Sequence, residues 1–308
     1  MKRLLLGLAA TLVCNSATSF QNEEEIQWPE LTGPYLGQKV PGNEPEVFAP
    51  GLVSTTEGFE LNSVFSPDGR IFMFSRRING AYKMFFSFRG ANGQWSEPRL
   101  AGPSKTYPGH ADVDMAFSQD QKWLYFISDR PLEGYSLDRY NIWRSRIGRN
   151  GLETPSPLEA NVNGPGHELY PMIVEDGSFY FSAPREDSLG GRDSYRAQYK
   201  DGKFEEPVNL GPAINSPQNE GDIFVSPDET YLIHVSSDRE GGFGEGDLYI
   251  SFKQANGAWG TSKNMGALFN SAETDYCPMM SPDGKYFFFS RGGDLMWVDS
   301  SVLENFKD

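Results

Sequence analysis

Five carboxylates recur at a regular interval along the chain, and they are the residues with the clearest chemical potential. Each lies six residues before the serine, or its counterpart, of a short turn. They are Glu60, Asp112, Glu168, Glu220 and Asp275. Carboxylates gathered in one place can bind cations, accept hydrogen bonds from hydroxyl groups or exchange protons with a substrate. Like charges held close together also raise one another's pKa and need compensation.

The turns that follow these carboxylates reveal an internal repeat. Their aspartates, Asp68, Asp120, Asp176, Asp228 and Asp283, are 52, 56, 52 and 55 residues apart. In each repeat an apolar strand leads into the turn, and a second strand, a loop and a third strand follow. Four of the five repeats add a fourth segment. Four short strands in a unit of this length predict the blade of a β-propeller.

The missing fourth segment of the last repeat has a counterpart near the amino terminus. Residues 46–60 (EVFAPGLVSTTEGFE) align without a gap on residues 206–220 (EPVNLGPAINSPQNE), which run from the fourth segment of the third repeat to Glu220. An N-terminal strand that completes the C-terminal blade would close the ring and remove two exposed sheet edges. The sequence therefore predicts an all-β fold, a five-bladed propeller over 46–308, preceded by an N-terminal extension over 20–45.

The repeats also resemble a known family. SPDGRIFMFSRR, SQDQKWLYFISDR, SPDGKYFFFSR and the connector EEPVNLGPAINS are similar to TolB-like β-propeller repeats of bacterial envelope proteins. The resemblance covers 46–308 and implies the propeller fold, which serves many roles. TolB itself has six blades and a separate partner domain. This chain departs from both features, so TolB's role in envelope translocation is not transferred to it.

The first residues have the pattern of a secretory signal. Lys2 and Arg3 precede a short apolar run, and small residues allow cleavage after Ser19, which predicts a signal peptide over 1–19. A lipid anchor at Cys14 is an alternative, although Val13 is bulky for that processing. We therefore expect a periplasmic or secreted protein of the bacterial envelope, with no membrane span. Only Cys277 would remain after cleavage, which excludes an intramolecular disulfide.

The charge of the chain bears on its partners. The formal net charge is -15 at pH 7. An acidic surface repels phosphate backbones and anionic lipids, which argues against nucleic acid as a partner.

The five carboxylates have two interpretations. In the first they pair within the fold with arginines that follow the second strands on the same face, namely Arg77, Arg130, Arg185, Arg239 and Arg291. In the second some of them stay unpaired at the mouth of the central channel and bind a ligand. The predicted ligand-binding residues are the five carboxylates with Arg130, Arg185 and Arg239, joined by Tyr170 and Tyr276 from nearby loops.

Two histidines offer a metal alternative. His110 and His167 lie in successive connectors, each close to one of the five carboxylates, and Asp114 is near the first. Such residues can hold a divalent cation. TolB-like oligogalacturonate lyases use a metal held by histidines, but two histidines are fewer than such a site needs. No cofactor is expected otherwise.

No complete catalytic constellation is present, because GxSxG, HExxH and CxxC motifs are all absent from the sequence. We therefore expect an exported, non-catalytic propeller that binds a protein, peptide or glycan ligand at its acid-lined central face. The alternative is a carbohydrate-active enzyme, either a glycosidase or a metal-dependent lyase, with paired carboxylates in the central funnel.

Overall fold

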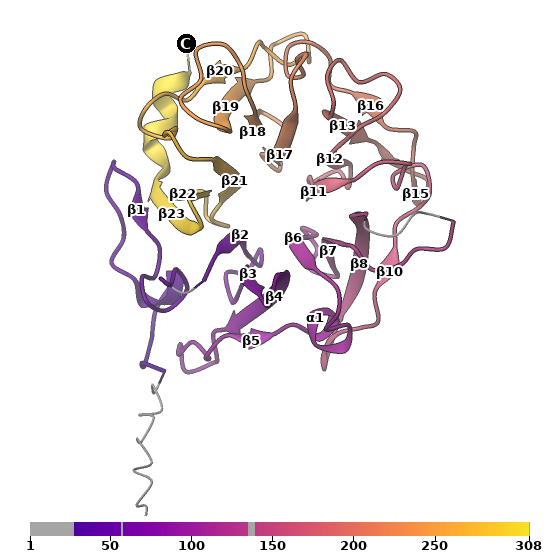
Figure 1. Ribbon diagram of the computed structural model, residues 1–308. Coiled ribbons are helices and arrows are strands. Elements are labelled where there is room, and N and C mark those ends of the chain that lie inside the picture. Colours follow the sequence, from indigo (N-terminus) through magenta and orange to yellow (C-terminus); the bar gives the residue numbers. More distant parts are fainter. Residues whose placement is uncertain (1–27, 57, 135–138, 308) are drawn as a thin grey trace, which may run out of the picture.

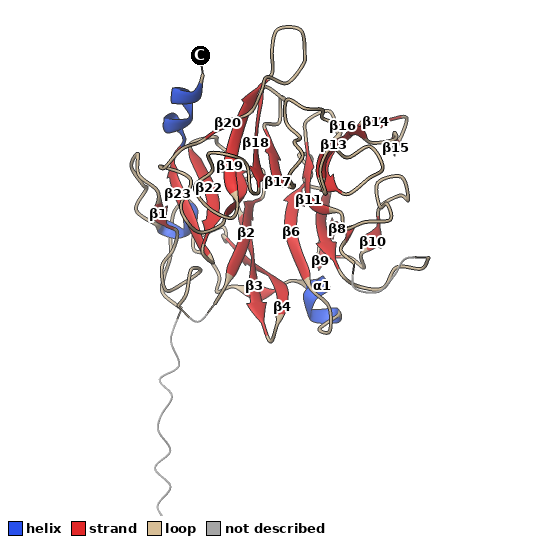
Figure 2. Cartoon of the chain, turned by 45° about the horizontal axis from the view of Figure 1, so that its top comes forward, coloured by secondary structure: helices blue, strands red, loops and turns tan. Residues whose placement is uncertain are grey.

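The computed structural model describes residues 28–56, 58–134 and 139–307, which form five blades around a central axis (Figure 1). This arrangement confirms the predicted five-bladed, all-β propeller. Each blade is an antiparallel sheet whose first strand lies nearest the axis. Strands dominate the molecule, and helices occur only at its periphery (Figure 2).

The strands follow one another around the ring in sequence order. Blade 1 consists of β2 (Glu60–Phe65), β3 (Ile71–Ile78), β4 (Ala81–Phe88) and β5 (Arg99–Leu100). Blade 2 consists of β6 (Asp112–Phe117), β7 (Trp123–Ser128), β8 (Asn141–Gly148) and β10 (Ser156–Pro157), with β9 (Gly151–Leu152) beside β8. Blade 3 consists of β11 (Leu169–Ile173), β12 (Phe179–Ala183), β13 (Asp193–Ala197) and β16 (Val208–Asn209).

The last two blades continue the pattern. Blade 4 consists of β17 (Glu220–Val225), β18 (Tyr231–Ser236), β19 (Asp247–Phe252) and β20 (Lys263–Asn264). Blade 5 consists of β21 (Asp275–Met280), β22 (Tyr286–Arg291), β23 (Asp294–Asp299) and β1 (Glu46–Val47). The remaining elements are the hairpin β14 (Tyr199–Lys200) and β15 (Lys203–Phe204), the helix α1 (Gly102–Thr106), and the 3-10 helices η1 (Tyr35–Gly37) and η2 (Ser300–Phe306).

The ring closes as the sequence predicted. β1 pairs antiparallel with β23, with Glu46 opposite Trp297 and Val47 opposite Met296. Phe48 follows β1 and packs at the junction of blades 5 and 1, its ring 5.2 Å from that of Phe288 and 5.4 Å from that of Phe72. Closure thus buries aromatic surface in addition to pairing a sheet edge.

The residues before β1 also pack on the ring, which the sequence did not indicate. The indole of Trp95 in blade 1 donates a hydrogen bond of 2.8 Å to the Gly33 carbonyl oxygen. The Tyr35 hydroxyl donates one of 2.6 Å to Asp283 in blade 5, and Leu36 is fully buried. This part of the predicted extension therefore bridges the two blades that meet at closure. The predicted signal peptide and Cys14 lie outside the described residues.

The SPDG turns define one face of the ring, here called the turn face. In blade 1 the Ser66 hydroxyl donates to Asp68 at 2.6 Å and accepts from the Ile71 amide at 2.9 Å. Gly69 takes a φ of 65°, which glycine adopts without strain. Because each inner strand runs toward this turn, its first residues lie at the opposite face, here called the first face. Within residues 28–56, 58–134 and 139–307, no helix has the length and apolar character needed to cross a bilayer.

Candidate functional site

The five inner strands share an irregularity at the third position, counted from the recurring carboxylate as the first. Each pairs with its neighbour through a register shift at or beside this position. The third residues are Asn62, Asp114, Tyr170, Asp222 and Cys277, and four of them have φ values between 41° and 55°. A bulge of this kind bends a strand and redirects a side chain. Left-handed backbone at non-glycine residues is costly and concentrates at functional sites.

These third residues connect blades across the axis. The Tyr170 hydroxyl in blade 3 donates a hydrogen bond of 2.9 Å to the Pro278 carbonyl oxygen in blade 5. Asp222 in blade 4 accepts the Cys277 amide at 3.0 Å and its thiol at 3.3 Å. Asn62 in blade 1 accepts the Met115 amide of blade 2 at 3.0 Å. Since blade 4 separates blades 3 and 5, the side chain of Tyr170 reaches across the channel.

Asp114 and Asp222 bring two carboxylates to this cluster from blades 2 and 4. Burial raises the pKa of Asp114 well above its usual range, and the nearby charge of Asp222 raises it further, while Arg192 opposes the shift. Burial also raises the pKa of the Cys277 thiol, and both carboxylates add to that effect. Burial therefore favours the neutral acid at Asp114 and the thiol at Cys277.

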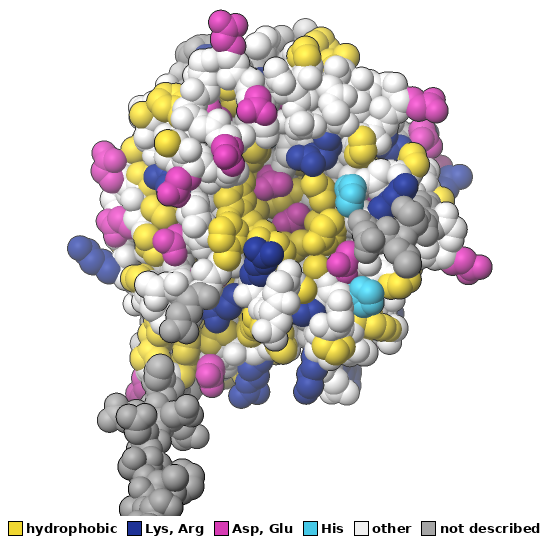
Figure 3. All heavy atoms as spheres, viewed as in Figure 1, with side chains coloured by type: hydrophobic (Ala, Val, Ile, Leu, Met, Phe, Trp, Pro, Cys, Tyr) yellow, Lys and Arg dark blue, Asp and Glu magenta, His cyan; other side chains and the backbone are white. Residues whose placement is uncertain are grey.

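A hollow lies above the cluster on the first face, here called the funnel. Figure 3 shows its hydrophobic walls and the acidic side chains at its bottom. Burial raises the pKa of Tyr82 and of Tyr140, and the charge of Asp114 adds to both shifts, so these two rings lie near the cluster. Because a ring of apolar walls with a few polar groups at the base is typical of ligand sites, the funnel is the candidate functional site.

Two buried polar atoms at this site lack partners. The Tyr276 side chain is 8% exposed, yet its hydroxyl has no hydrogen-bond partner among the described residues. The Nδ2 amide of Asn62 is likewise unpaired within that part of the chain. Burial raises the pKa of Tyr276, with Cys277, Tyr82 and Asp222 as neighbours that contribute. The Tyr276 side chain therefore lies within range of the charges of Asp222 and Tyr82, although neither is within hydrogen-bond distance of its hydroxyl.

The five recurring carboxylates are buried within their blades, which agrees with the first of the two interpretations. Glu60, Asp112, Glu168, Glu220 and Asp275 have no exposed area. Four of them form ion pairs inside their own blades, at 2.7 Å for Arg76 with Glu60, 2.5 Å for Arg130 with Asp112, 2.8 Å for Arg239 with Glu220 and 2.5 Å for Arg291 with Asp275. The carboxylates that face the hollow are instead Asp114 and Asp222.

The internal arginine belt is present in four blades, and in one of them a different arginine forms the pair. In blade 1 the partner is Arg76 rather than the expected Arg77, which is exposed. The arginines also stack on aromatic rings. Arg130, for example, lies 4.6 Å from the ring centre of Tyr107 and 5.2 Å from that of Trp143. Ion pairing and cation–π contacts together orient these buried side chains.

Glu168 has no ion pair among the described residues. It accepts the Gly164 amide at 2.9 Å and the Asn141 side-chain amide at 3.1 Å. Arg185, the expected partner, instead donates to the carbonyl oxygens of Asn161 and Val162. Burial raises the pKa of Glu168 to about 7, although both hydrogen bonds and the more distant charge of Arg185 oppose the shift.

The predicted metal ligands are not assembled. Both partly exposed histidines appear on the first face (Figure 3). His110 lies 3.3 Å from Asp129, and His167 accepts the Tyr140 amide at 3.2 Å. Asp114 belongs to the cluster below them. Within 28–56, 58–134 and 139–307, no three His, Cys, Asp or Glu side chains are grouped to hold a metal.

Sequence reasoning located part of the funnel and missed the rest. It named Asp114, Tyr170 and Tyr276, but placed both tyrosines in or beside the rim loops, whereas they are buried at the base. It did not identify Asp222, and it assigned Cys277 to packing. An alignment of the residues that lie two positions after each recurring carboxylate would have grouped Asn62, Asp114, Tyr170, Asp222 and Cys277.

Comparison with known proteins gives likeness of fold. No family model matches the chain, and no curated protein matches it. Among solved structures, TolB from Acinetobacter baumannii is 14% identical, with a TM-score of 0.48 over 80% of this chain and 55% of that one. The chain thus covers about half the length of that TolB.

Two further solved structures have similar scores. A putative TolB from Agrobacterium tumefaciens is 18% identical, with a TM-score of 0.47 over 77% of this chain and 73% of that one. XC5397 from Xanthomonas campestris, described as a gluconolactonase, is 12% identical, with a TM-score of 0.46 over 86% of this chain and 97% of that one. At these identities the comparison concerns the fold and not the activity. The chain is a five-bladed β-propeller.

Proposed function

We propose that this chain is an exported, non-catalytic propeller that binds a glycan in the funnel. The observation that carries the proposal is the Tyr276 hydroxyl, which is buried within range of the charge of Asp222 and has no partner in the described part of the chain. A buried hydroxyl without a hydrogen bond costs free energy, and native proteins rarely leave one unpaired. A ligand hydroxyl reaching the base of the funnel would supply the missing bond.

The other groups at the base suit a ligand that is rich in hydroxyls. Burial and the charge of Asp222 raise the pKa of Asp114 and so favour its neutral form, which can donate a hydrogen bond. The amide of Asn62 offers a second donor, and Asp222 provides acceptor oxygens. Tyr82 and Tyr140, whose pKa values are raised by burial and by the charge of Asp114, offer ring faces on which the C–H groups of a sugar can pack.

The binding test uses variants that separate affinity from stability. We expect Tyr276→Phe to lower the affinity for a glycan ligand about tenfold, since it removes one buried hydrogen bond. It should leave the free protein as stable as before or more stable, because it removes an unpaired hydroxyl. Asp222→Asn should also weaken binding. The matched control is Asp238→Asn, which removes an exposed acid from a loop on the same face.

The measurements are a glycan array, titration calorimetry on the hits, and urea denaturation of each variant without ligand. An array without hits, or hits whose affinity is the same for wild type, Tyr276→Phe and Asp222→Asn, would overturn the proposal. A protein or peptide captured in place of a glycan, with the same dependence on Tyr276, would also overturn the ligand class while keeping the site.

Export is a separate part of the proposal, resting on the signal pattern in residues 1–19. N-terminal sequencing of the protein from the periplasm or medium should begin at Phe20. A chain that begins at a lipid-modified Cys14 would show the anchored alternative, and an unprocessed chain in the cytoplasm would contradict export.

The enzymatic alternative has one observation in its favour. The charge of Asp222 adds to burial in raising the pKa of Asp114, and an acid with a raised pKa near a second carboxylate is the usual arrangement for glycoside hydrolysis. Mass spectrometry of oligosaccharides incubated with the protein, with and without chelator, tests it. Products that disappear in Asp114→Asn would establish an enzyme, whereas unchanged oligosaccharides would retire this alternative.

A further inference from the structure

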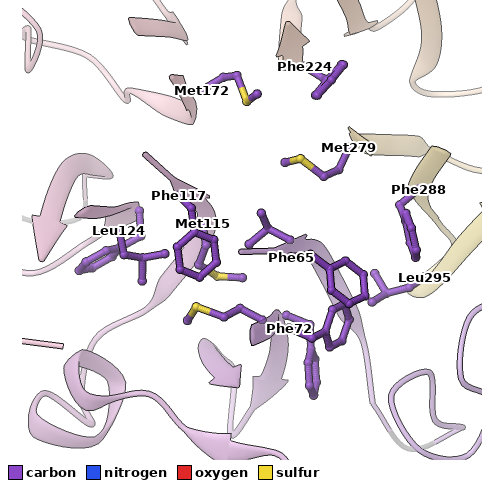
Figure 4. Packing of buried hydrophobic residues seen from close by; sticks show 14 of the residues in the cluster. Phe65, Phe72, Met115, Phe117, Leu124, Met172, Phe224, Met279, Phe288 and Leu295 are labelled. Carbon is purple, nitrogen blue, oxygen red and sulfur yellow. The ribbon is translucent and has the colours of Figure 1, made fainter. Parts of the chain in front are cut away.

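The channel has a second recess at the turn face, here called the apolar pocket. Its volume is about 230 Å³. Each blade contributes to the lining the residue that lies four positions after its recurring carboxylate. These residues are Val64, Ala116, Met172, Phe224 and Met279. Met172 and Met279 project toward one another across the space (Figure 4). None of the lining residues is charged.

Tyr170 separates this pocket from the funnel. On β11 it lies two residues before Met172, and its hydroxyl binds the Pro278 carbonyl oxygen, directly before Met279. The Tyr170 side chain is 1% exposed. A ligand in the apolar pocket therefore meets the lower side of this cross-channel contact and does not reach Asp114 or Asp222.

Acidic residues surround the apolar pocket. Pro67, Gln119, Pro227 and Pro282 line it, and an aspartate of the turn follows each of them. These turn aspartates are Asp68, Asp120, Asp228 and Asp283. Although partial burial raises the pKa of Asp228, hydrogen bonds from Ser226 and Thr230 lower it below its usual range overall. Hydrogen bonds with Tyr35 and Ser281 likewise lower the pKa of Asp283, against the effect of partial burial.

We propose that the apolar pocket binds one bulky apolar side chain of a partner's basic peptide segment, with lysines or arginines on either side of the anchor meeting the turn aspartates. The volume is below the roughly 300–1,000 Å³ of sites for drug-sized ligands, and it suits a single anchor side chain. Methionines adapt to anchors of different shape. Lys122 already pairs with Asp120 at 2.8 Å, and Lys285 with Asp283 at 3.2 Å. Asp68 and Asp228 form no ion pair among the described residues, so these two acids are the ones that a basic segment would meet. The acidic net charge of the whole chain favours such a segment as well.

The same charges argue against other occupants. A second copy of this chain would bring an identical acidic rim into contact with the first. An acyl chain with an anionic headgroup would place that headgroup among the turn aspartates. Both arrangements juxtapose like charges, which is unfavourable.

The test follows methionine methyl groups by NMR in protein labelled with ¹³C at these methyls. The probe is an acetylated, amidated peptide, Lys-Lys-Gly-Phe-Gly-Lys-Lys. We expect the signals of Met172 and Met279 to shift in a saturable way, while Met265, which is buried in a different cluster, stays in place. Replacing Phe by Ser should abolish the shifts, and replacing the lysines by glutamates should do the same.

Variants of the rim test the electrostatic part. Asp68→Asn with Asp228→Asn should weaken binding about fivefold, since two exposed charge pairs are lost. Asparagine keeps the acceptor oxygen that each turn uses, and thermal melts check that both proteins are folded. Asp238→Asn, on the first face, should leave the affinity unchanged.

Three results would overturn the proposal. The first is the absence of shifts at Met172 and Met279 at millimolar peptide. The second is equal binding of the lysine and glutamate peptides, which would mean that charge plays no part. The third is a shift that depends on protein concentration without peptide, which would identify a second copy as the occupant.

Discussion

The hydroxyl of Tyr170 in blade 3 donates a 2.9 Å hydrogen bond to the carbonyl oxygen of Pro278 in blade 5, across the central channel. This bond links two blades that are not neighbours, and it divides the channel into a polar funnel and an apolar pocket. We expect Tyr170→Phe to lower the free energy of unfolding by about 1–2 kcal/mol, because a buried carbonyl oxygen loses its partner.

Urea denaturation monitored by fluorescence checks this value, with Tyr199→Phe as the control, since that ring is exposed on the hairpin of β14 and β15. Equal losses in the two variants would show that the cross-channel bond contributes nothing of its own.

Glu168 should make stability depend on pH. Its pKa is about 7 in the folded protein, against an ordinary value of 4.5 for a solvated glutamate. Below pH 4.5 both the folded and the unfolded chain carry the proton. Between pH 4.5 and 7 the unfolded chain ionises while the fold does not, so stability falls by about 3 kcal/mol as pH rises, and above pH 7 it is constant. Glu168→Gln should lack this component and be more stable than wild type at pH 8.

The measurement is urea denaturation of both proteins from pH 4 to 8. Their difference should widen over this interval, whereas the exposed control Glu97→Gln should track wild type throughout. A constant difference between Glu168→Gln and wild type would contradict the assigned pKa.

A double-mutant comparison should show that Arg130 and Asp112 are energetically coupled. Asp112 has no exposed area and lies 2.5 Å from the guanidinium. Arg130→Met leaves a buried carboxylate without its counter-charge, which we expect to cost about 3–5 kcal/mol. Adding Asp112→Asn should recover a large part of that loss. If the double variant loses as much as the sum of the two single changes, the pair is not coupled.

Replacing His234 by an apolar residue should stabilise the folded protein. It is fully buried on β18 in blade 4, and neither ring nitrogen has a hydrogen-bond partner among the described residues. Burial lowers its pKa to about 3, so it is neutral. The corresponding residue of blade 2, two before the strand's last serine, is Phe126.

We expect His234→Phe to raise the free energy of unfolding by about 1–3 kcal/mol, since two unpaired polar atoms are removed. Thermal and urea denaturation provide the check. Destabilisation would mean that the nitrogens have partners, such as buried water, that phenylalanine cannot replace.

The blades and their closure could be predicted from the sequence because each depends on a pattern that recurs. The position of β1 follows from the alignment of residues 46–60 on residues 206–220. The base of the funnel could not be predicted. A bulge reverses which face of a strand a side chain occupies, and one residue of shift moves every later side chain to the other face. Hence Asp222 reaches the channel while Glu220 is buried within its blade.

The arginine of blade 1 shows the same sensitivity. Arg76 pairs with Glu60 because it lies within β3 directly opposite that residue. Arg77, one residue later, points to the other side of the same strand and is exposed. The packing of residues 28–45 on blades 1 and 5 could not be predicted from the repeats, because it occurs only once.

The pairing of β1 with β23 joins residue 46 to residue 297, which has a consequence for biosynthesis. While the ribosome is still making blade 5, the amino-terminal strand has no sheet to join, and the wheel stays open at one gap. Closure therefore waits for the synthesis of β23, and a product interrupted before β23 would present an unpaired strand edge to other chains.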